Sequence, residues 1–196
     1  LMFDKLKSLD TDLMIFLNNL GSEHFDFLWL AITNKYTWIP FYFFLIYLYF
    51  NSKKLKPKSI FFFFFVIGLM ILFTDQSSNL TKQHFQILRP CHDESIYGLI
   101  RVVKEGCGGL YGFFSAHASN SFAIASFFYF SFTNYNKWRK FLFLWAAIIA
   151  YSRVYCGVHF PSDVVVGGTY GLASGYLAFI FYNYLLKNQS FLSKSV

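Results

Sequence analysis

The chain has 196 residues, of which 56% are hydrophobic and only 14% are charged, and its mean hydropathy is +0.41. This length favours a single domain over residues 1–196, while so little charge excludes an ordinary soluble domain. The formal net charge of +7 would suit nucleic acid, but the basic residues lie between long apolar segments. We therefore expect a membrane protein with no nucleic-acid partner.

The first stretch of the chain mixes charges with apolar residues. Asp12, Glu23 and Asp26 interrupt the apolar stretches 13–20 and 27–32. We expect an amphipathic surface helix here, followed by a short first membrane span. The N-terminus lacks a basic flank, an uninterrupted apolar core and a small-residue cleavage site, so no cleavable signal peptide is expected.

Four uncharged runs follow, and each can hold most or all of a membrane-crossing helix of roughly 20 residues. They cover residues 36–52, 59–74, 106–136 and 164–186. A shorter run, 141–152, has Trp138 and Tyr151 beside its ends, where interfacial aromatic residues are expected. Together with the first span, these segments predict an all-α, integral membrane six-helix bundle.

The basic residues indicate how the spans are oriented. Six spans place both termini on one side, and that side holds more basic residues, as cytoplasmic segments of membrane proteins do. The predicted cytoplasmic set is Lys5, Lys7, Lys53, Lys54, Lys56, Lys58, Lys137, Arg139, Lys140, Lys187 and Lys194. The predicted outer set is Lys35, Lys82, Arg89, Arg101, Lys104 and Arg153. We expect a bacterial inner membrane protein with cytoplasmic termini and its polar motifs facing the periplasm.

A long outer loop is predicted over residues 90–114, and loops of this length usually serve a function. Cys91 and Cys107 both fall in it, so a disulfide is chemically allowed in an oxidising periplasm, although the sequence leaves the pairing open. Cys156 has no obvious partner and is interpreted as a small apolar filler. No Cys/His spacing resembles a zinc site, and no metal is expected.

Lys82 and Arg89 belong to the first of three charged motifs. They are seven residues apart, so on a continuous helix they would lie on one face, about 10 Å apart along the axis. Pro90 is expected to end that helix and leave Arg89 at its mouth. The pair could merely reach the lipid headgroups, but Arg153 supplies a third cation at the end of another predicted span.

His159 and Asp163 follow Arg153 in the third motif. Because Pro161 favours the first turn of a helix, the last span is expected to begin there, with His159 just outside. Asp163 can then orient one imidazole nitrogen and leave the other as a free lone pair, beside a helix end that favours anions. The alternative is a structural pair that closes a helix end.

Ser115, Ala116 and His117 stand where the loop meets an uncharged span. Ser115 can cap that helix, so that its hydroxyl and the following N–H groups face a phosphate oxygen, although a plain helix cap is the alternative. His117 would be costly in the apolar layer without a partner. A role as proton donor to a departing oxygen meets that objection.

These three strings resemble the signature of the type 2 phosphatidic acid phosphatase superfamily, which also includes the vanadium haloperoxidases. The family pattern is Lys-x6-Arg-Pro, Pro-Ser-Gly-His and Ser-Arg-x5-His-x3-Asp. Its first and third strings are matched in full, by Lys82, Arg89, Pro90, Ser152, Arg153, His159 and Asp163. The middle string has Phe114 and Ala116 in place of Pro and Gly, which affects the loop because Ala resists backbone angles that Gly tolerates.

The resemblance implies roles for the motif residues. His159 would attack phosphorus to give a phosphohistidine, Asp163 would orient it, and His117 would protonate the leaving group. The phosphate oxygens would be bound by Lys82, Arg89, Arg153, Ser115 and Ala116. Fixed cations take the place of a divalent ion in this scheme, so neither metal nor cofactor is expected.

The function implied is hydrolysis of the terminal phosphate of a membrane lipid. The candidate substrates are undecaprenyl pyrophosphate, phosphatidylglycerol phosphate, phosphatidic acid and lipid A, and the sequence does not choose between them. The alternatives are a vanadate-dependent, haloperoxidase-like oxidoreductase and a non-catalytic phosphate-binding membrane protein. Beyond the lipid substrate and the bilayer, no obligatory protein partner is expected.

Three further charged residues have two interpretations each. Asp75 lies two turns inward from Lys82 and either serves function or hydrogen-bonds a neighbouring helix. Arg101 and Lys104 in the loop either touch a substrate headgroup or are solvated charges.

Overall fold

The computed structural model describes residues 2–53, 57–132 and 138–192, and the fold of these residues is all-α, as predicted. The elements are α1 (Met2–Asn19), α2 (Glu23–Thr33), η1 (Lys35–Trp38), α3 (Ile39–Ser52), α4 (Pro57–Phe85), η2 (Pro90–His92), η3 (Glu94–Ile96), α5 (Ala116–Ser131), η4 (Trp138–Lys140), α6 (Phe141–Tyr155) and α7 (Pro161–Leu192). Prolines near the starts of α3, α4 and α7 fit helix first turns, where a missing N–H costs nothing.

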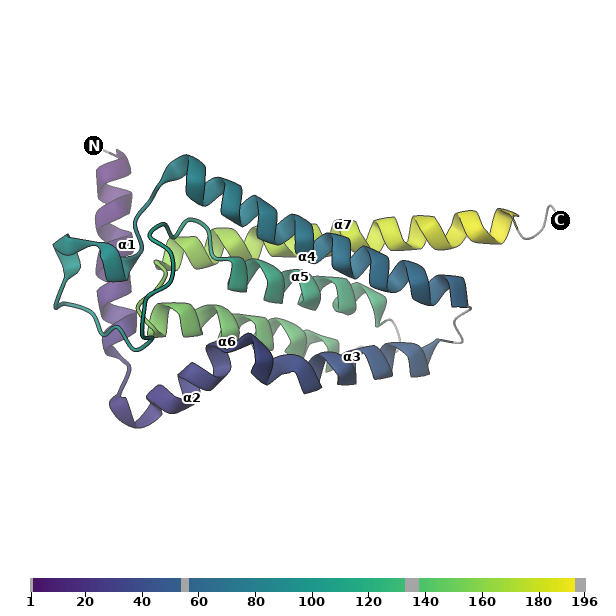
Figure 1. Cartoon of the computed structure of the whole chain (residues 1–196), viewed down its shortest axis with the longest axis horizontal. Coiled ribbons are helices and arrows are strands. Elements are labelled where there is room, and N and C mark those ends of the chain that lie inside the picture. The colour runs from purple at the N-terminus through teal and green to yellow at the C-terminus, as the bar shows by residue number, and fades with distance from the viewer. Residues whose placement is uncertain (1, 54–56, 133–137, 193–196) are drawn as a thin grey trace.

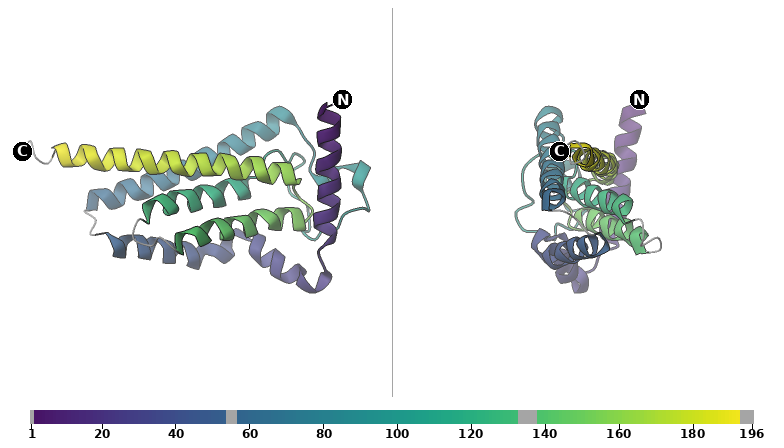
Figure 2. Two further views of the ribbon diagram at one scale, coloured as in Figure 1. Left: turned by 180° about the vertical axis from the view of Figure 1, so that it is seen from behind. Right: turned by 90° about the vertical axis from the view of Figure 1, so that its right-hand side faces the viewer.

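The helices form an elongated bundle in which α4, α5, α6 and α7 run lengthwise, and α2, η1 and α3 follow one another along the same direction (Figure 1). Helix α1 instead lies crosswise over one end of the bundle, as Figure 2 shows from two further sides. At that end α4 stops, α5 starts, α6 stops and α7 starts. All three charged motifs are therefore gathered at the end that α1 covers.

Hydrogen bonds fix α1 in this crosswise position. The side chain of Asp10 accepts a hydrogen bond from the backbone N of Ser162, at 2.9 Å, in the first turn of α7. The amide Nδ2 of the fully buried Asn18 donates to the carbonyl oxygens of Val154 and Tyr155, at 3.1 and 2.9 Å, at the end of α6. Both contacts tie α1 to the motif end of the bundle.

The prediction that both termini lie on one side is therefore wrong for the described chain. α1 lies at the motif end, together with Lys5 and Lys7, whereas α7 ends at the opposite end of the bundle (Figure 1). The cause is that α2 and α3 share one lengthwise path instead of forming two spans. The 11 residues of α2 give about 16 Å of helix, roughly half of the 30 Å hydrocarbon layer, so α2 does not cross it alone. Of the predicted cytoplasmic basic residues, Lys54, Lys56, Lys137 and Lys194 lie outside the described residues.

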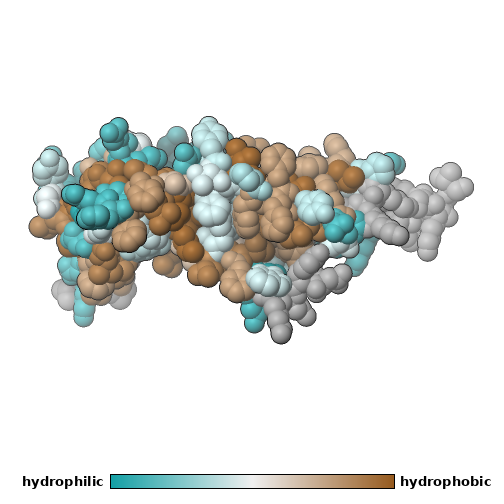
Figure 3. Space-filling model, turned by 90° about the horizontal axis from the view of Figure 1, so that it is seen from below, coloured by the Kyte–Doolittle hydropathy of each residue, from teal (hydrophilic) through white to brown (hydrophobic). Residues whose placement is uncertain are grey.

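Within the described residues, two helices are each long and apolar enough to cross a membrane, α4 over Pro57–Phe85 and α7 over Pro161–Asn188. Only 28% and 33% of their most apolar windows are buried, whereas the core helix of a soluble protein would be mostly buried. Large apolar side chains such as Phe61, Phe73 and Leu177 are more than half exposed. Figure 3 shows hydrophobic residues over the middle of the bundle and hydrophilic residues toward its ends, which is the pattern of a protein embedded in lipid.

Helices α5 and α7, which carry two of the motifs, pack with their backbones in close approach. A Cβ built on Gly167 would stand 2.5 Å from the carbonyl oxygen of Ser115, and one built on Gly171 would overlap the carbonyl oxygen of Ser119. Small residues at helix interfaces permit this packing in membranes, where apolar burial does not drive association. The start of α5 is thereby held directly against the start of α7.

Candidate active site

The end of the bundle under α1 brings the three charged motifs together. Lys82 lies in the last turn of α4 and Arg153 in the last turn of α6. Arg89 lies in the loop after α4, Ser115 caps α5, and His159 directly precedes α7. The three motifs, far apart in the sequence, therefore lie at the same end of the bundle.

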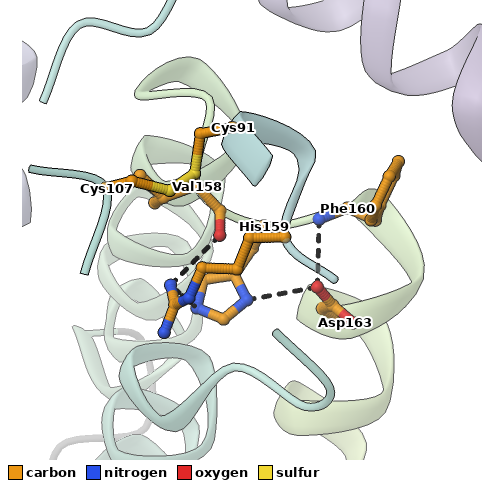
Figure 4. Close-up of a disulfide and its surroundings, with 7 residues drawn as sticks. Cys91, Cys107, Val158, His159, Phe160 and Asp163 are labelled. Atoms are coloured by element: carbon orange, nitrogen blue, oxygen red, sulfur yellow. Dashed lines mark hydrogen bonds and ion pairs between the residues drawn. A yellow bond between two sulfur atoms is a disulfide. The ribbon is translucent and has the colours of Figure 1, made fainter. Parts of the chain in front are cut away.

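His159 is the centre of this group, and its side chain is only 2% exposed. Its Nδ1 lies 3.2 Å from Asp163 Oδ2 (Figure 4), and its Nε2 lies 3.1 Å from Arg89 Nη1. Because a guanidinium nitrogen can only donate, Nε2 accepts this hydrogen bond and the imidazole proton sits on Nδ1, facing Asp163. The nitrogen with the lone pair therefore faces the cation.

Asp163 holds this arrangement from the first turn of α7. Its Oδ2 also accepts a hydrogen bond from the backbone N of Phe160, at 3.1 Å, and Figure 4 shows Asp163 between the His159 ring and Phe160. The predicted start of the last span at Pro161 and the predicted approach of Asp163 to His159 are both confirmed. The carboxylate is 1% exposed, so its orientation is fixed by protein contacts alone.

Burial lowers the pKa of His159 well below its usual value, and the positive charge of Arg89 acts in the same direction. Smaller contributions of the same sign come from Arg153, Lys82 and His117. The imidazole is therefore neutral at neutral pH, as a nucleophile requires.

Arg89 reaches His159 by a route that differs from the predicted one. Helix α4 ends at Phe85, because Gln86 adopts a left-handed backbone conformation with φ of 51°, so Lys82 and Arg89 do not share a continuous helix. Arg89 lies instead in an extended segment, and the backbone N of Arg89 donates to Leu110 O at 3.1 Å. Its Nη1 also donates to Val158 O at 3.1 Å, which aims the guanidinium at His159. Burial lowers the pKa of Arg89, with Asp163 opposing this effect, yet a guanidinium stays charged.

Arg153 is 3% exposed and is held by a residue that the sequence analysis did not single out. Its Nη1 donates to the hydroxyl of Thr33 at the end of α2. The Nε atoms of Arg153 and Arg89 are both buried and have no hydrogen-bond partner within the described residues. Buried donors of this kind fit an anion, because phosphate oxygens would satisfy them.

Ser115 caps α5, as predicted, and its hydroxyl accepts from the backbone N of Ala118 at 3.5 Å. Ala116 is the first residue of the helix, where backbone N–H groups have no intrahelical acceptor. The loop before the cap is held by Ser78, whose hydroxyl donates to the carbonyl oxygen of Phe114, the residue that stands in place of the family's Pro, at 2.9 Å. His117 lines a cavity together with Thr33.

A disulfide joins Cys91 and Cys107, so the pairing that the sequence left open is present (Figure 4). The disulfide joins the segment that follows Arg89 to the loop segment before Leu110, whose carbonyl oxygen accepts from the Arg89 backbone N. His92 lies near the two sulfur atoms, and the three potential ligand atoms are within 4.8 Å of one another. Thiolate ligation of a metal would require both sulfur atoms as free thiolates, but the disulfide bond joins them.

Of the remaining loop charges, Arg101 is not a free solvated charge. Its Nη2 forms an ion pair with Asp26, at 2.7 Å from Oδ2, and its backbone N donates to Asn18 Oδ1 at 2.6 Å. These contacts anchor the outer loop to α1 and α2. Cys156 is a free, fully buried thiol packed with Tyr155 and Val158, as a small apolar filler would be.

The site combines buried guanidinium groups, a helix N-terminus and a neutral imidazole that faces a guanidinium. These features define the class of protein, which is a helical membrane protein equipped for phosphoryl transfer. Comparison with known families assigns it more closely. The model of the PAP2 superfamily matches residues 60–187, more than half of the chain. The chain belongs to the PAP2 superfamily.

Two curated relatives cover most of this chain. It is 34% identical over 179 residues to a lipid A 4'-phosphatase of Bacteroides thetaiotaomicron, which covers 90% of this chain and 78% of the relative. It is 33% identical over 186 residues to a lipid A 4'-phosphatase of Porphyromonas gingivalis, covering 90% of this chain and 75% of the relative.

Two crystal structures share the fold. The structure of Aquifex aeolicus LpxE has a TM-score of 0.63 and 24% identity, and covers 87% of this chain and 94% of that one. A transmembrane PAP2 type phosphatidylglycerolphosphate phosphatase from Bacillus subtilis also has a TM-score of 0.63, with 18% identity, and covers 94% and 87%. The chain is a membrane lipid phosphatase of the PAP2 type. These relatives lend no support to the haloperoxidase-like and non-catalytic alternatives.

Proposed function

We propose that this chain removes the 4'-phosphate of lipid A by way of a phosphohistidine at His159. The observation that carries the proposal is the geometry of that imidazole, with Nδ1 held 3.2 Å from Asp163 and Nε2 facing Arg89 at 3.1 Å. The choice of lipid rests on the two curated relatives, each named a lipid A 4'-phosphatase and each at least 33% identical to this chain.

The reaction begins when the substrate phosphate enters among Lys82, Arg89 and Arg153. Its oxygens take up the guanidinium donors of Arg89, including the one that bonds His159 in the free protein. The Nε2 lone pair is thereby released to attack phosphorus, and the bond from phosphorus to the lipid oxygen breaks. Asp163 stabilises the positive charge that develops on the imidazole.

The remaining motif residues serve the leaving group and the oxygens. The Ser115 hydroxyl and the Ala116 backbone N–H face the phosphate from the start of α5, and fixed dipoles of this kind stabilise charge in the transition state. His117 gives its proton to the departing lipid oxygen and then takes one from the water that hydrolyses the phosphohistidine. Released phosphate and free His159 complete the cycle. The scheme uses no metal ion, cofactor or protein partner.

The proposal includes a location, the bacterial inner membrane with the site facing the periplasm. The disulfide between Cys91 and Cys107 supports it, since disulfides persist in oxidising compartments. With five lengthwise segments, counting α2 and α3 as one, the end of α7 then lies in the cytoplasm and α1 lies on the periplasmic surface.

The test is hydrolysis of bis-phosphorylated lipid A by protein purified in detergent, with the product located by mass spectrometry. We expect loss of the phosphate on the non-reducing sugar, activity that survives EDTA, and no product from His159→Ala. Phosphatidic acid, undecaprenyl pyrophosphate and phosphatidylglycerol phosphate are assayed alongside. Faster turnover of any of these three, or product formed by His159→Ala, would overturn the proposal.

A further inference from the structure

A second polar feature lies within the bundle, next to the proposed phosphate site. A cavity of about 260 Å³ opens beside His117 and reaches toward the middle of the helices. It is lined from the α2 to η1 junction, from α4 and from α5, and its polar lining residues are Thr33, Lys35, Asp75, His117, Asn120 and Ser121. We call this space the inner pocket.

The inner pocket contains a carboxylate that the proposed mechanism does not use. Asp75 accepts a hydrogen bond from Asn120 Nδ2 at 2.8 Å on its Oδ1. Asn120 is itself fixed, because Thr74 donates to its Oδ1 at 2.5 Å. The second carboxylate oxygen of Asp75 makes no hydrogen bond to the part of the chain that the structure describes. A carboxylate at this depth is expensive, and such residues usually line a path or a site.

The order of polar groups along the bundle matches the order of groups in a phospholipid. Asp75 and Lys82 are seven residues apart on α4, so they share a face and are separated by about 10 Å along its axis. Asn120 lies one turn deeper than His117 on α5. A lipid whose phosphate sits at Lys82 therefore places its alcohol at the level of His117 and Asn120, with its acyl chains further into the bilayer.

The chemistry of the inner pocket selects among alcohols. The second oxygen of Asp75 is an acceptor, so a ligand pairs with it only if that ligand carries a hydroxyl or N–H group near the phosphoester. An acylated amino sugar has such donors, whereas phosphatidic acid and prenyl pyrophosphates carry only acceptors or hydrocarbon there. A buried polar group discriminates strongly against a ligand that leaves it unpaired. The volume is at the small end for ligand pockets, which start at roughly 300 Å³, so it suits one ring and not the acyl chains.

We infer that the inner pocket binds the sugar that bears the reacting phosphate, and that Asp75 determines specificity by accepting a hydrogen bond from a sugar hydroxyl or amide. This inference rests on the proposed function and adds to it the residue that tells a glycolipid phosphate from a glycerolipid phosphate. Asp75 contacts only the alcohol half of the substrate, so its contribution falls on binding and not on the chemistry at phosphorus.

The test compares Asp75→Asn and Asp75→Ala with the parent on two substrates, lipid A and dioleoyl phosphatidic acid. For lipid A we expect kcat/KM to fall about 10-fold in Asp75→Asn and about 100-fold in Asp75→Ala, chiefly through KM. For phosphatidic acid both variants should stay within about threefold of the parent. Thr81→Ala is the matched control on α4 and should leave both activities unchanged. Among the described residues, the Thr81 hydroxyl bonds only its own helix, at Ser77 and Ser78.

Each outcome separates this inference from the proposed function. Equal losses on both substrates would mean that Asp75 only holds α4 against α5, and unchanged activity on both would mean that it touches no substrate; either result overturns the inference alone. A parent protein that hydrolyses phosphatidic acid but not lipid A overturns the proposed function, and this inference with it. Thermal midpoints measured for all variants confirm that Asp75→Asn, the isosteric change, is folded.

Discussion

Adding one methyl group at Gly112 should slow catalysis although every motif residue stays unchanged in sequence. A Cβ at this position would stand 2.9 Å from Asp163 Oδ2 and 3.3 Å from Arg89 Cγ. Ordinary contact begins at 3.4 Å, so the carboxylate must retreat by about 0.5 Å. Gly112 is not in a left-handed conformation, so the substitution acts through this contact and not through backbone strain.

The size of the effect follows from the hydrogen bond that the methyl group would stretch. Asp163 Oδ2 is already 3.2 Å from His159 Nδ1, at the long end of the useful range, and a further 0.5 Å breaks the bond. Catalytic geometry tolerates about 0.5 Å of error, and a hydrogen bond to a charged group contributes about 1.5–3 kcal/mol. We therefore expect kcat of Gly112→Ala to fall about 10- to 100-fold.

The assay is phosphate release from lipid A, and the loop supplies its own control. Gly109 lies three residues away, where a Cβ would meet nothing within 4 Å. Gly109→Ala should therefore retain full activity. If Gly112→Ala were as active as Gly109→Ala, Asp163 would not be positioning His159 in the way that the structure implies.

Three further predictions concern neighbouring groups. Replacing both Cys91 and Cys107 by Ser opens a loop of 16 residues and should lower the free energy of unfolding by about 3 kcal/mol. The thermal midpoint should fall, and dithiothreitol should lower the midpoint of the parent in the same way. An unchanged midpoint with reductant would count against a stabilising disulfide. Arg89→Lys loses the paired contacts to His159 and Val158 and should lower kcat/KM about 100-fold, whereas Arg139→Lys at the opposite end should not; equal rates would refute this. Because the pKa of His159 is lowered in the folded chain, this imidazole binds a proton below about pH 6.5 only in the unfolded chain. Protonation therefore stabilises the unfolded chain, and the free energy of unfolding falls as pH falls below that value. Nitrogen NMR of labelled histidine should find the signal of a neutral imidazole at pH 6 that is absent in His159→Gln. A signal from protonated His159 at that pH would contradict the lowered pKa.

The parts of the site that local sequence rules govern were predictable. Proline at the first turn of a helix fixes where α7 starts, and a spacing of four residues then brings Asp163 to His159. Serine after a glycine-containing loop and before a long uncharged run predicts the cap of α5 at Ser115. Each inference needs only neighbours along the chain.

The parts that depend on tertiary contacts were not predictable in the same way. The left-handed conformation at Gln86 ends α4 early, and the sequence does not predict it because neither glycine nor asparagine stands at that position. The hydroxyl that holds Arg153 comes from Thr33, 120 residues away. The crosswise position of α1 depends on Asp10 reaching the start of α7, so the charge pattern of the N-terminal stretch placed Lys5 and Lys7 on the wrong side.

Trapping the covalent intermediate tests directly whether His159 is the nucleophile. The protein is mixed for milliseconds with lipid A that carries radiolabelled phosphate at the 4' position, quenched in alkali and digested. We expect a label that is stable to alkali, lost in acid and carried by the peptide containing His159, and no label in His159→Ala. A label on any other residue, or one that persists in His159→Ala, would contradict this expectation.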